Sequence, residues 1–303
     1  MEKYKIIIDT DIGDDIDDAF ALAVALALPE YEILGITSVY RNVNMRSKIA
    51  KAELDYYGHG DIKVYCGEDY PIKEPLKMFP FERKGEDGKV IITHYQENMA
   101  GYNYEEKSAI DFLLESAKKH PNEIVLFAIG PLTNLARAYQ QDSETFKKFK
   151  KIVIMGGIIN QSFAEWNIKC DPEAADIVLK SGVDIQMVGL DITRKCVLKD
   201  ETLKQILSFE SKGNKLLASM MKIWIKNNNK NPILHDPLTI ASFVRPFCEF
   251  SKHKVEVILD GDKRGYTVES QNGNEILYAE NVDNNAFEQF ILDTLKKAES
   301  NCC

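Results

Sequence analysis

The chain has 303 residues, of which 45% are hydrophobic and 28% charged, a composition typical of a globular protein with one large domain or two smaller ones. Its net charge of −9 argues against a nucleic-acid partner, because such partners require a basic surface. The six cysteines include no CxxC pair, no signal-peptide region precedes the first apolar run, and the longest such run, residues 19–28, is too short to cross a bilayer. We therefore expect a cytoplasmic protein with no membrane partner.

Continuous apolar runs recur along the chain, and each is followed by a turn signal and a helical pattern. This alternation predicts an α/β protein with an open, mostly parallel, Rossmann-like sheet and helices on both faces. The predicted strands are residues 5–8, 33–39, 62–65, 124–129, 152–155 and 185–190. The predicted helices are residues 18–28, 44–57, 107–119, 132–139, 172–181, 201–208, 210–227, 237–241 and 285–298.

The C-terminal part of the chain has a different pattern. Residues 254–259, 266–269 and 276–279 alternate between apolar and polar side chains, which predicts a small antiparallel edge on the sheet. No internal repeat or low-complexity linker interrupts the sequence, so we expect a single domain over residues 1–303.

The most informative segment is residues 9–18, DTDIGDDIDD, in which six aspartates lie between an isoleucine run and an alanine- and leucine-rich helical pattern. Carboxylates this dense repel one another unless a cation or strong hydrogen-bond donors neutralise them. At the end of a buried strand they predict a site for a hard cation. Ligands bind outside the carboxyl ends of parallel strands, so we expect further site residues just after the other strands.

Other classes of DxD protein fit this segment less well. An EF-hand loop requires an oxygen ligand at its fifth position, where this chain has Gly13. A haloacid-dehalogenase-like phosphatase also begins with a strand and a DxD motif, and Asp9 would be its nucleophile. That class, however, expects Thr or Val in place of Gly13 and has no use for Asp17 and Asp18. Helix caps and solvated carboxylates explain one or two of the six aspartates, not all.

Two further polar segments are weak signals on their own. Leu234-His235-Asp236-Pro237-Leu238 precedes a predicted helix, so Asp236 could be only a helix cap beside a core imidazole. Glu165-Trp166-Asn167 precedes Asp171-Pro172, a pattern that also suits a polar loop with proline at the start of a helix.

Taken together, the segments resemble the inosine-uridine-preferring nucleoside hydrolase family over essentially the whole chain. The matching segments are DTDIGDDIDDAFAL near the start, AIGPLTNLA at residues 128–136, MGG at 155–157, AEWNIKCDPEAA at 164–175 and LHDPL at 234–238. The resemblance implies a Ca²⁺-dependent enzyme that cleaves the N-glycosidic bond of a ribonucleoside with water. It also implies a role in nucleoside or nucleobase salvage, and a homodimer or homotetramer.

The resemblance also assigns roles to individual residues. Asp11 resembles the general base and a metal ligand, and Asp18, Asp236 and the carbonyl of Ile129 resemble the other protein ligands of Ca²⁺. His235 resembles a histidine that assists departure of the base in some members. The implied substrate-binding residues are Asp17, Asn42, Glu165 and Asn167 on the ribose side, with Trp166, His94 and Arg41 as further candidates. Tyr40 and Tyr95 are additional candidates for stacking on the base.

Three departures from the family pattern concern the substrate pocket. Two extra residues follow Gly13, so the family's Asp-Asp-Ala could align with Asp17-Asp18-Ala19 or with the earlier pair Asp14-Asp15; we favour the former because the helix begins there. Arg41 stands where glycine is frequent. The segment between residues 157 and 165 looks shortened, which leaves Asn160 as an uncertain ribose ligand.

These departures leave the base open among pyrimidines, purines and modified bases such as a 7-deazapurine. Two rival functions also remain at this point. One is the dehalogenase-like phosphatase, and the other is a family member that binds a nucleoside or sugar without turnover.

Overall fold

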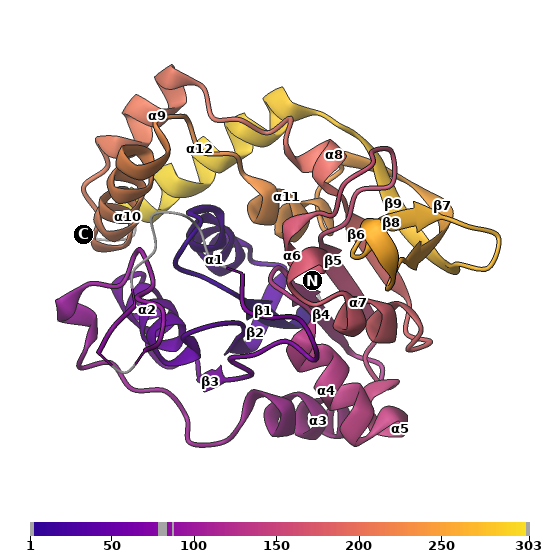
Figure 1. The fold of residues 1–303 in the computed structure, drawn as a ribbon. Helices are drawn as coiled ribbons and strands as arrows, with labels where there is room; N and C mark the ends of the chain where they lie inside the picture. Colours follow the sequence, from indigo (N-terminus) through magenta and orange to yellow (C-terminus); the bar gives the residue numbers. More distant parts are fainter. Residues whose placement is uncertain (1–2, 78–83, 87, 301–303) are drawn as a thin grey trace.

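The computed structural model describes residues 3–77, 84–86 and 88–300 of the chain. One sheet of nine strands has the order β3-β2-β1-β4-β5-β6-β9-β7-β8 (Figure 1). The strands from β3 to β9 in this order pair in parallel, whereas β7 pairs antiparallel with both β9 and β8. The predicted α/β class, with a mostly parallel sheet and a small antiparallel edge, is therefore confirmed.

The elements follow the predicted order closely. The strands are β1 (Tyr4–Thr10), β2 (Tyr31–Ser38), β3 (Val64–Cys66), β4 (Ile124–Ala128), β5 (Lys151–Met155), β6 (Ile185–Val188), β7 (Cys248–Val257), β8 (Thr267–Glu269) and β9 (Asn274–Val282). The longer helices are α1 (Asp17–Ala27), α2 (Val43–Tyr56), α3 (Ala109–Lys119), α4 (Thr133–Gln141), α7 (Pro172–Leu179), α9 (Asp200–Leu207), α10 (Lys212–Asn228), α11 (His235–Ser242) and α12 (Asn284–Ser300).

Several short elements differ from the sequence-based prediction. Three helices of four or five residues were not predicted: α5 (Ser143–Phe146), α6 (Trp166–Cys170) and α8 (Leu190–Thr193). The 3₁₀ helices are η1 (Glu97–Met99) and η2 (Gly261–Lys263). The strand predicted at 185–190 ends at Val188 because α8 begins at Leu190, and the strand predicted at 62–65 lies at Val64–Cys66. Such elements are too short to give a hydrophobic period.

The sheet is buried on both faces, which explains the continuous apolar runs in the sequence. In β1, Ile6 and Ile8 belong to one buried cluster and Ile7 to the other, because alternate side chains point to opposite faces. Helices α1, α2, α10, α11 and α12 contribute to the first cluster, and α3, α4 and α7 to the second. Figure 1 shows α9, α10 and α12 grouped far from α3, α4 and α5, with the strands between them.

The strand order places a crevice beside β1. From β1 the chain adds β2 and β3 on one side, then returns to add β4, β5 and β6 on the other. At such a switch point the chain leaves the two neighbouring strands toward opposite faces of the sheet, so a crevice with room for a ligand lies between the loops that follow them. The acidic loop after β1 and the loop after β4 therefore meet at one edge of the sheet. Within the described ranges, no helix has the length and apolar character required to cross a membrane.

Candidate active site

A cavity of about 220 Å³ lies at the carboxyl ends of the central strands. Ten of the residues singled out in the sequence line it: Asp11, Asp17, Asp18, Arg41, Ile129, Glu165, Trp166, Asn167, His235 and Asp236. They come from loops after β1, β2, β4 and β5 and from the start of α11, so segments more than 200 residues apart in sequence converge on one space. The cavity is also lined by Asp14, Asp15, Met155 and Leu190.

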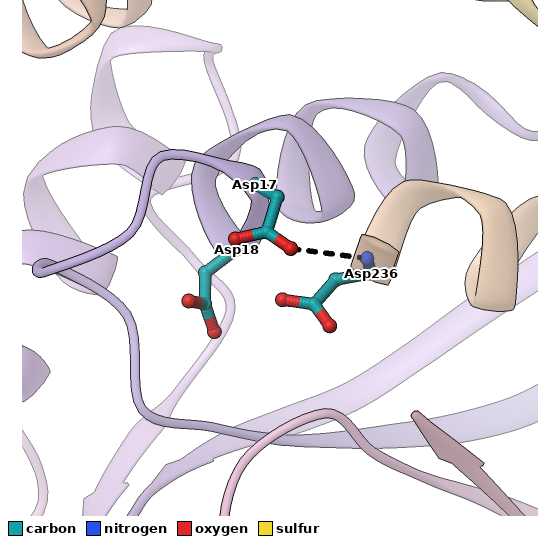
Figure 2. A group of neighbouring side chains, drawn as sticks. All are labelled: Asp17, Asp18 and Asp236. Carbon is teal, nitrogen blue, oxygen red and sulfur yellow. Dashed lines mark hydrogen bonds between the residues drawn. The ribbon is translucent and has the colours of Figure 1, made fainter. Parts of the chain in front are cut away.

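The centre of the cavity holds three buried carboxylates, those of Asp17, Asp18 and Asp236. One oxygen from each lies within 4.8 Å of the others, and Figure 2 shows the three side chains converging. The backbone N–H of Asp236 donates to Oδ2 of Asp17 at 3.3 Å, and Thr10 Oγ1 donates to Oδ1 of Asp18 at 2.5 Å. Burial, and then repulsion from neighbouring carboxylates that include Asp11, raises the pKa of all three groups well above the usual range. The group could hold a cation that takes oxygen ligands.

This geometry distinguishes the two possible alignments of the acidic loop. Asp17 and Asp18 lie with Asp236, whereas Asp14 points to two arginines and Asp15 is exposed. The first two residues of α1 carry two of the three carboxylates, in agreement with the alignment that we favoured.

Asp14 forms a buried network with Arg41 and Arg46. Its Oδ2 accepts hydrogen bonds from both guanidinium groups, at 2.6 Å from Arg46, and its Oδ1 accepts from the backbone N–H and hydroxyl of Thr93. Burial opposes ionisation of Asp14, but the two neighbouring cations outweigh it and hold the pKa of this carboxyl below its usual value. Asp14 is thus an ionised partner of the arginines and not a member of the trio.

Arg46 ties the loops after β1 and β2 together. Its side chain, on α2, is completely buried, and Nε donates to the carbonyl of Tyr40 at 2.7 Å. Nη1 donates to the carbonyls of Asp11 and Ile12. Tyr40 and Arg41 have φ values of 69° and 63°, a left-handed conformation that costs energy for residues other than glycine and needs support from its surroundings. Arg46 supplies that support.

Asp11 lies next to this network and is the first residue after β1. Burial raises the pKa of its carboxyl, and the positive charge of Arg46 partly offsets that effect. The loop after β4 approaches closely: a Cβ on Gly130 would lie 2.9 Å from both the backbone nitrogen and Oδ1 of Asp11. Glycine is therefore required at 130 for the loop after β4 to approach Asp11 this closely.

The loop after β5 contributes Glu165 and Asn167. Glu165 caps α6 by accepting from the backbone N–H groups of Asn167 at 2.9 Å and Ile168 at 3.2 Å, and it also accepts from Gly157 N–H at 3.0 Å. Burial raises its pKa to about 7. Asn167 Nδ2 donates to the carbonyls of Ile129 and Met155, at 3.1 and 3.2 Å. The amide of Asn167 is thus fixed, with its oxygen left for other donors.

His235 is the first residue of α11 and lines the cavity beside the trio. Its Nδ1 lies 2.7 Å from the hydroxyl oxygen of Thr193, at the end of α8. Burial lowers the pKa of the imidazole to about 4, so the ring is neutral at physiological pH.

Two predicted substrate residues do not line this cavity. Asn42 caps α2, accepting from Met45 N–H at 3.4 Å and donating to the carbonyl of Val90 at 3.0 Å. His94 is completely buried, and its backbone N–H donates to the carbonyl of Gly13 at 2.8 Å. Within the described residues, neither ring nitrogen of His94 has a hydrogen-bond partner. The cap explains the position of Asn42; the structure gives no account of the His94 ring.

The weaker candidates also lie elsewhere. Asn160 donates to Asp191 at 2.9 Å, and the hydroxyl of Tyr40 accepts from Lys77 N–H at 2.7 Å. Tyr95 packs against the core and is not among the cavity-lining residues. Asp9 is completely buried, and its Oδ1 accepts from Thr37 and from Asn134. A nucleophile must reach its substrate, so this position argues against the phosphatase alternative.

Sequence reasoning missed Arg46 and Thr193. Arg46 stands in an amphipathic helical pattern, where a charged residue is normally taken as exposed. Thr193 lies in a helix of four residues with no periodic signal. Neither position carries a pattern from which its contact could have been predicted.

Comparisons with known proteins identify the family of the chain. A family model described as inosine-uridine preferring nucleoside hydrolase matches residues 6–289. Uridine nucleosidase 1 of Arabidopsis thaliana is 37% identical over 281 residues, covering 88% of this chain and 82% of the relative. Among solved structures, the plant nucleoside hydrolase PpNRh1 superposes with a TM-score of 0.86 at 29% identity, covering 96% of this chain and 98% of that one. A purine-preferring ribonucleoside hydrolase from Gardnerella vaginalis has a TM-score of 0.83 at 29% identity, with 97% and 99% covered.

Proposed function

Because the chain belongs to the inosine-uridine preferring nucleoside hydrolase family, we propose that it hydrolyses the N-glycosidic bond of a ribonucleoside in a Ca²⁺-dependent reaction, releasing free base and ribose. The observation that carries the proposal is a single cavity in which a carboxylate trio, Asp11 and a neutral His235 face one another. Such a site offers a general base that can deprotonate water, negative charge that stabilises a cationic sugar, and a hydrogen-bond donor for the leaving group.

The residues present fit a hard divalent cation. We propose that Asp11, Asp18, Asp236 and the carbonyl of Ile129 hold Ca²⁺. Every one of these donors is an oxygen, as Ca²⁺ requires. Asp18 and Asp236 also belong to the buried trio, whose carboxylates are stable together only when a cation or protons offset their repulsion. When bound, the ion lowers the pKa of water and so supplies hydroxide character at neutral pH.

The reaction then follows from the positions of the side chains. Asp11 accepts a proton from the attacking water while the oxygen of that water bonds to the anomeric carbon of the ribose. The bond between that carbon and the base nitrogen breaks, and positive charge develops on the sugar in an oxocarbenium-like transition state. The surrounding carboxylates stabilise that charge. The departing base keeps the bonding electrons and takes up one proton from solvent.

Orientation of the sugar is the second contribution of the protein. We assign the ribose hydroxyls to Asp17, Glu165 and Asn167, whose side chains are held by hydrogen bonds to the backbone. Fixed polar groups of this kind lower the entropy cost of reaching the transition state. Asn42 holds its loop by capping α2 and is not assigned to the sugar.

The preferred nucleobase and the biological role are more specific proposals. One relative is named for uridine and one similar structure for purines, so uridine and inosine both belong in the first panel. Arg41 and Trp166 line the cavity and are the side chains from which base preference would arise. We keep a 7-deazapurine nucleoside as a test substrate, because Arg41 and the short loop before Glu165 change this part of the pocket. Nucleoside salvage is the pathway in which we expect the activity.

The test is ribose release from uridine, cytidine, inosine, adenosine and a 7-deazaguanosine, with Ca²⁺ and after chelation. Asp11→Asn and Asp9→Asn form a matched pair, since each removes one carboxylate, Asp9 near the end of β1 and Asp11 just after it. We expect Asp11→Asn to lose at least about 100-fold in kcat, the scale of a missing general base, and Asp9→Asn to retain most activity.

The rival functions make different predictions in the same experiment. Phosphate release from 4-nitrophenyl phosphate that depends on Asp9 would establish the dehalogenase-like phosphatase instead. Nucleoside binding by calorimetry with no ribose release would establish a binding protein.

A further inference from the structure

His235 and Thr193 form a contact between two elements that are far apart in the sequence. His235 begins α11, Thr193 ends α8, and Thr193 Oγ1 lies 2.7 Å from His235 Nδ1. The hydroxyl is completely buried. Either partner could be the donor on distance alone, so the direction of the hydrogen bond must come from what else each group can reach.

The surroundings of Thr193 decide the direction. A buried hydroxyl hydrogen without an acceptor is energetically unfavourable. Helical threonines commonly donate to the carbonyl four residues earlier, and Thr239 does so to the carbonyl of His235 at 3.2 Å. In the described part of the chain, Thr193 Oγ1 has no such bond, and Nδ1 of His235 is its hydrogen-bond partner. The hydroxyl therefore donates, and Nδ1 accepts.

We propose that Thr193 is a positioning residue that fixes the neutral imidazole of His235 with its hydrogen on Nε2, so that Nε2–H donates to the departing base. An Nδ1 that accepts a hydrogen bond carries no hydrogen, so the contact with Thr193 itself makes the ring neutral and puts its one hydrogen on Nε2. Within the described residues, no protein group bonds to Nε2, and His235 lines the cavity. This inference rests on the proposed nucleoside hydrolase reaction.

The tautomer matters because the two forms act oppositely on the leaving group. As the bond to the anomeric carbon breaks, electron density builds up on the base. Nε2–H stabilises that density, whereas a lone pair on Nε2 would repel it. The Nε2–H group donates a hydrogen bond to the departing nucleobase and keeps its hydrogen. The oxygen of the attacking water bonds to the sugar, and one proton of that water passes to Asp11. The nucleobase takes its proton from solvent.

The position of Thr193 is fixed by the packing of α8. Asp191, on the same helix, accepts from the hydroxyl of Tyr278 at 2.5 Å and from Asn160 at 2.9 Å. Gly189 caps the helix, and a Cβ there would overlap the Tyr278 hydroxyl at 1.7 Å. Thr193 N–H donates to the Gly189 carbonyl at 3.0 Å. A hydroxyl on so constrained a helix is preorganised for the imidazole.

The test compares two substrates whose leaving groups differ in their need for help. A nucleoside requires stabilisation of the departing base, whereas 4-nitrophenyl β-D-riboside releases a stable anion unaided. We expect Thr193→Val to lower kcat about tenfold or more on the nucleoside, with KM within about threefold, and to leave the 4-nitrophenyl riboside within about twofold. Thr193→Ser keeps the hydroxyl and should restore the nucleoside rate.

Thr239→Val is the matched control. Both variants remove a buried threonine hydroxyl that contacts His235, but Thr239 contacts its backbone carbonyl and not its ring. We expect Thr239→Val to change both substrates by less than about threefold. Equal losses on both substrates in Thr193→Val, or an equal nucleoside-specific loss in Thr239→Val, would overturn the proposal in favour of a packing role.

A second readout separates this inference from the proposed function. Nitrogen NMR of histidine-labelled protein, with the His235 signals assigned from the missing peaks of His235→Gln, reports which ring nitrogen carries the hydrogen. We expect a protonated Nε2 and a bare Nδ1 in the wild type; the reverse assignment would refute the role of Thr193. If the wild type cleaves neither substrate, the proposed reaction fails, and the spectrum still decides the tautomer.

Discussion

Removal of Ca²⁺ should lower the thermal stability of the protein through the carboxylate trio. Asp17, Asp18 and Asp236 bring buried oxygens within 4.8 Å of one another. At that distance two unit charges repel by about 3.5 kcal/mol for an effective dielectric constant of 20, so the empty site is unstable when all three groups are ionised. A cation that binds only the folded state removes this repulsion.

The expected shift follows from binding linkage. At a free Ca²⁺ concentration of about 100 times the dissociation constant, a ligand of the folded state adds about 2.7 kcal/mol to the free energy of unfolding. A chain of 303 residues has an unfolding entropy of roughly 0.6 kcal/mol/K, so this increment corresponds to about 4 °C in Tm. Each further tenfold in Ca²⁺ should add roughly 2 °C.

Differential scanning calorimetry with and without a chelator measures this shift. Asp236→Asn should abolish most of it, because it removes one carboxylate of the trio. Asp9→Asn should keep it, because Asp9 is equally buried but lies outside the trio. A shift that is absent in the wild type, or undiminished in Asp236→Asn, would refute the assignment of Asp236 as a ligand of the cation.

Three further outcomes are expected. The Ca²⁺-induced shift in Tm should shrink as pH falls from 8 to 5, because the raised pKa values of the trio let protons compete with the cation. Without metal, the same raised pKa values should make the free energy of unfolding fall as pH rises. Calorimetry across this pH range measures both trends. Asp14→Asn should cost about 3–5 kcal/mol of unfolding free energy in urea titrations, because Arg41 and Arg46 then lose their buried counter-charge; a loss below about 1 kcal/mol would contradict the network. Gly130→Ala should reduce both stability, by about 1–3 kcal/mol, and ribose release, because its Cβ would press on Asp11; unchanged activity would mean that the two loops can separate freely.

The sequence was sufficient to predict the fold and the place of the site. The isoleucine run of β1 is buried on both faces, so it forms a continuous apolar pattern that only a central parallel strand explains. Because β1 is central, the aspartates that follow it had to face the crevice at the carboxyl edge. Glu165 and Asn167 were predicted from the family resemblance and not from this reasoning, and both line the cavity at this edge.

Sequence reasoning could not predict contacts that depend on two side chains meeting across elements. Arg46 lies in an ordinary amphipathic helix, and its burial follows from the loops that fold over it. Asn42 has the right sequence context for a ligand but caps α2. A local motif fixes which loop carries a residue, whereas the rotamer and partner depend on packing that one sequence does not reveal.

The guanidinium of Arg46 also makes the two sides of the site thermodynamically dependent on each other. It joins the backbone of Asp11 to the loop that carries Arg41, with Asp14 between the two arginines. With Ca²⁺ held at Asp11 as proposed, we expect a substrate group that moves Arg41 to change the affinity of the site for the cation. Reciprocity requires the cation to change substrate affinity by the same factor, so measured nucleoside affinities have a meaning only at a stated Ca²⁺ concentration.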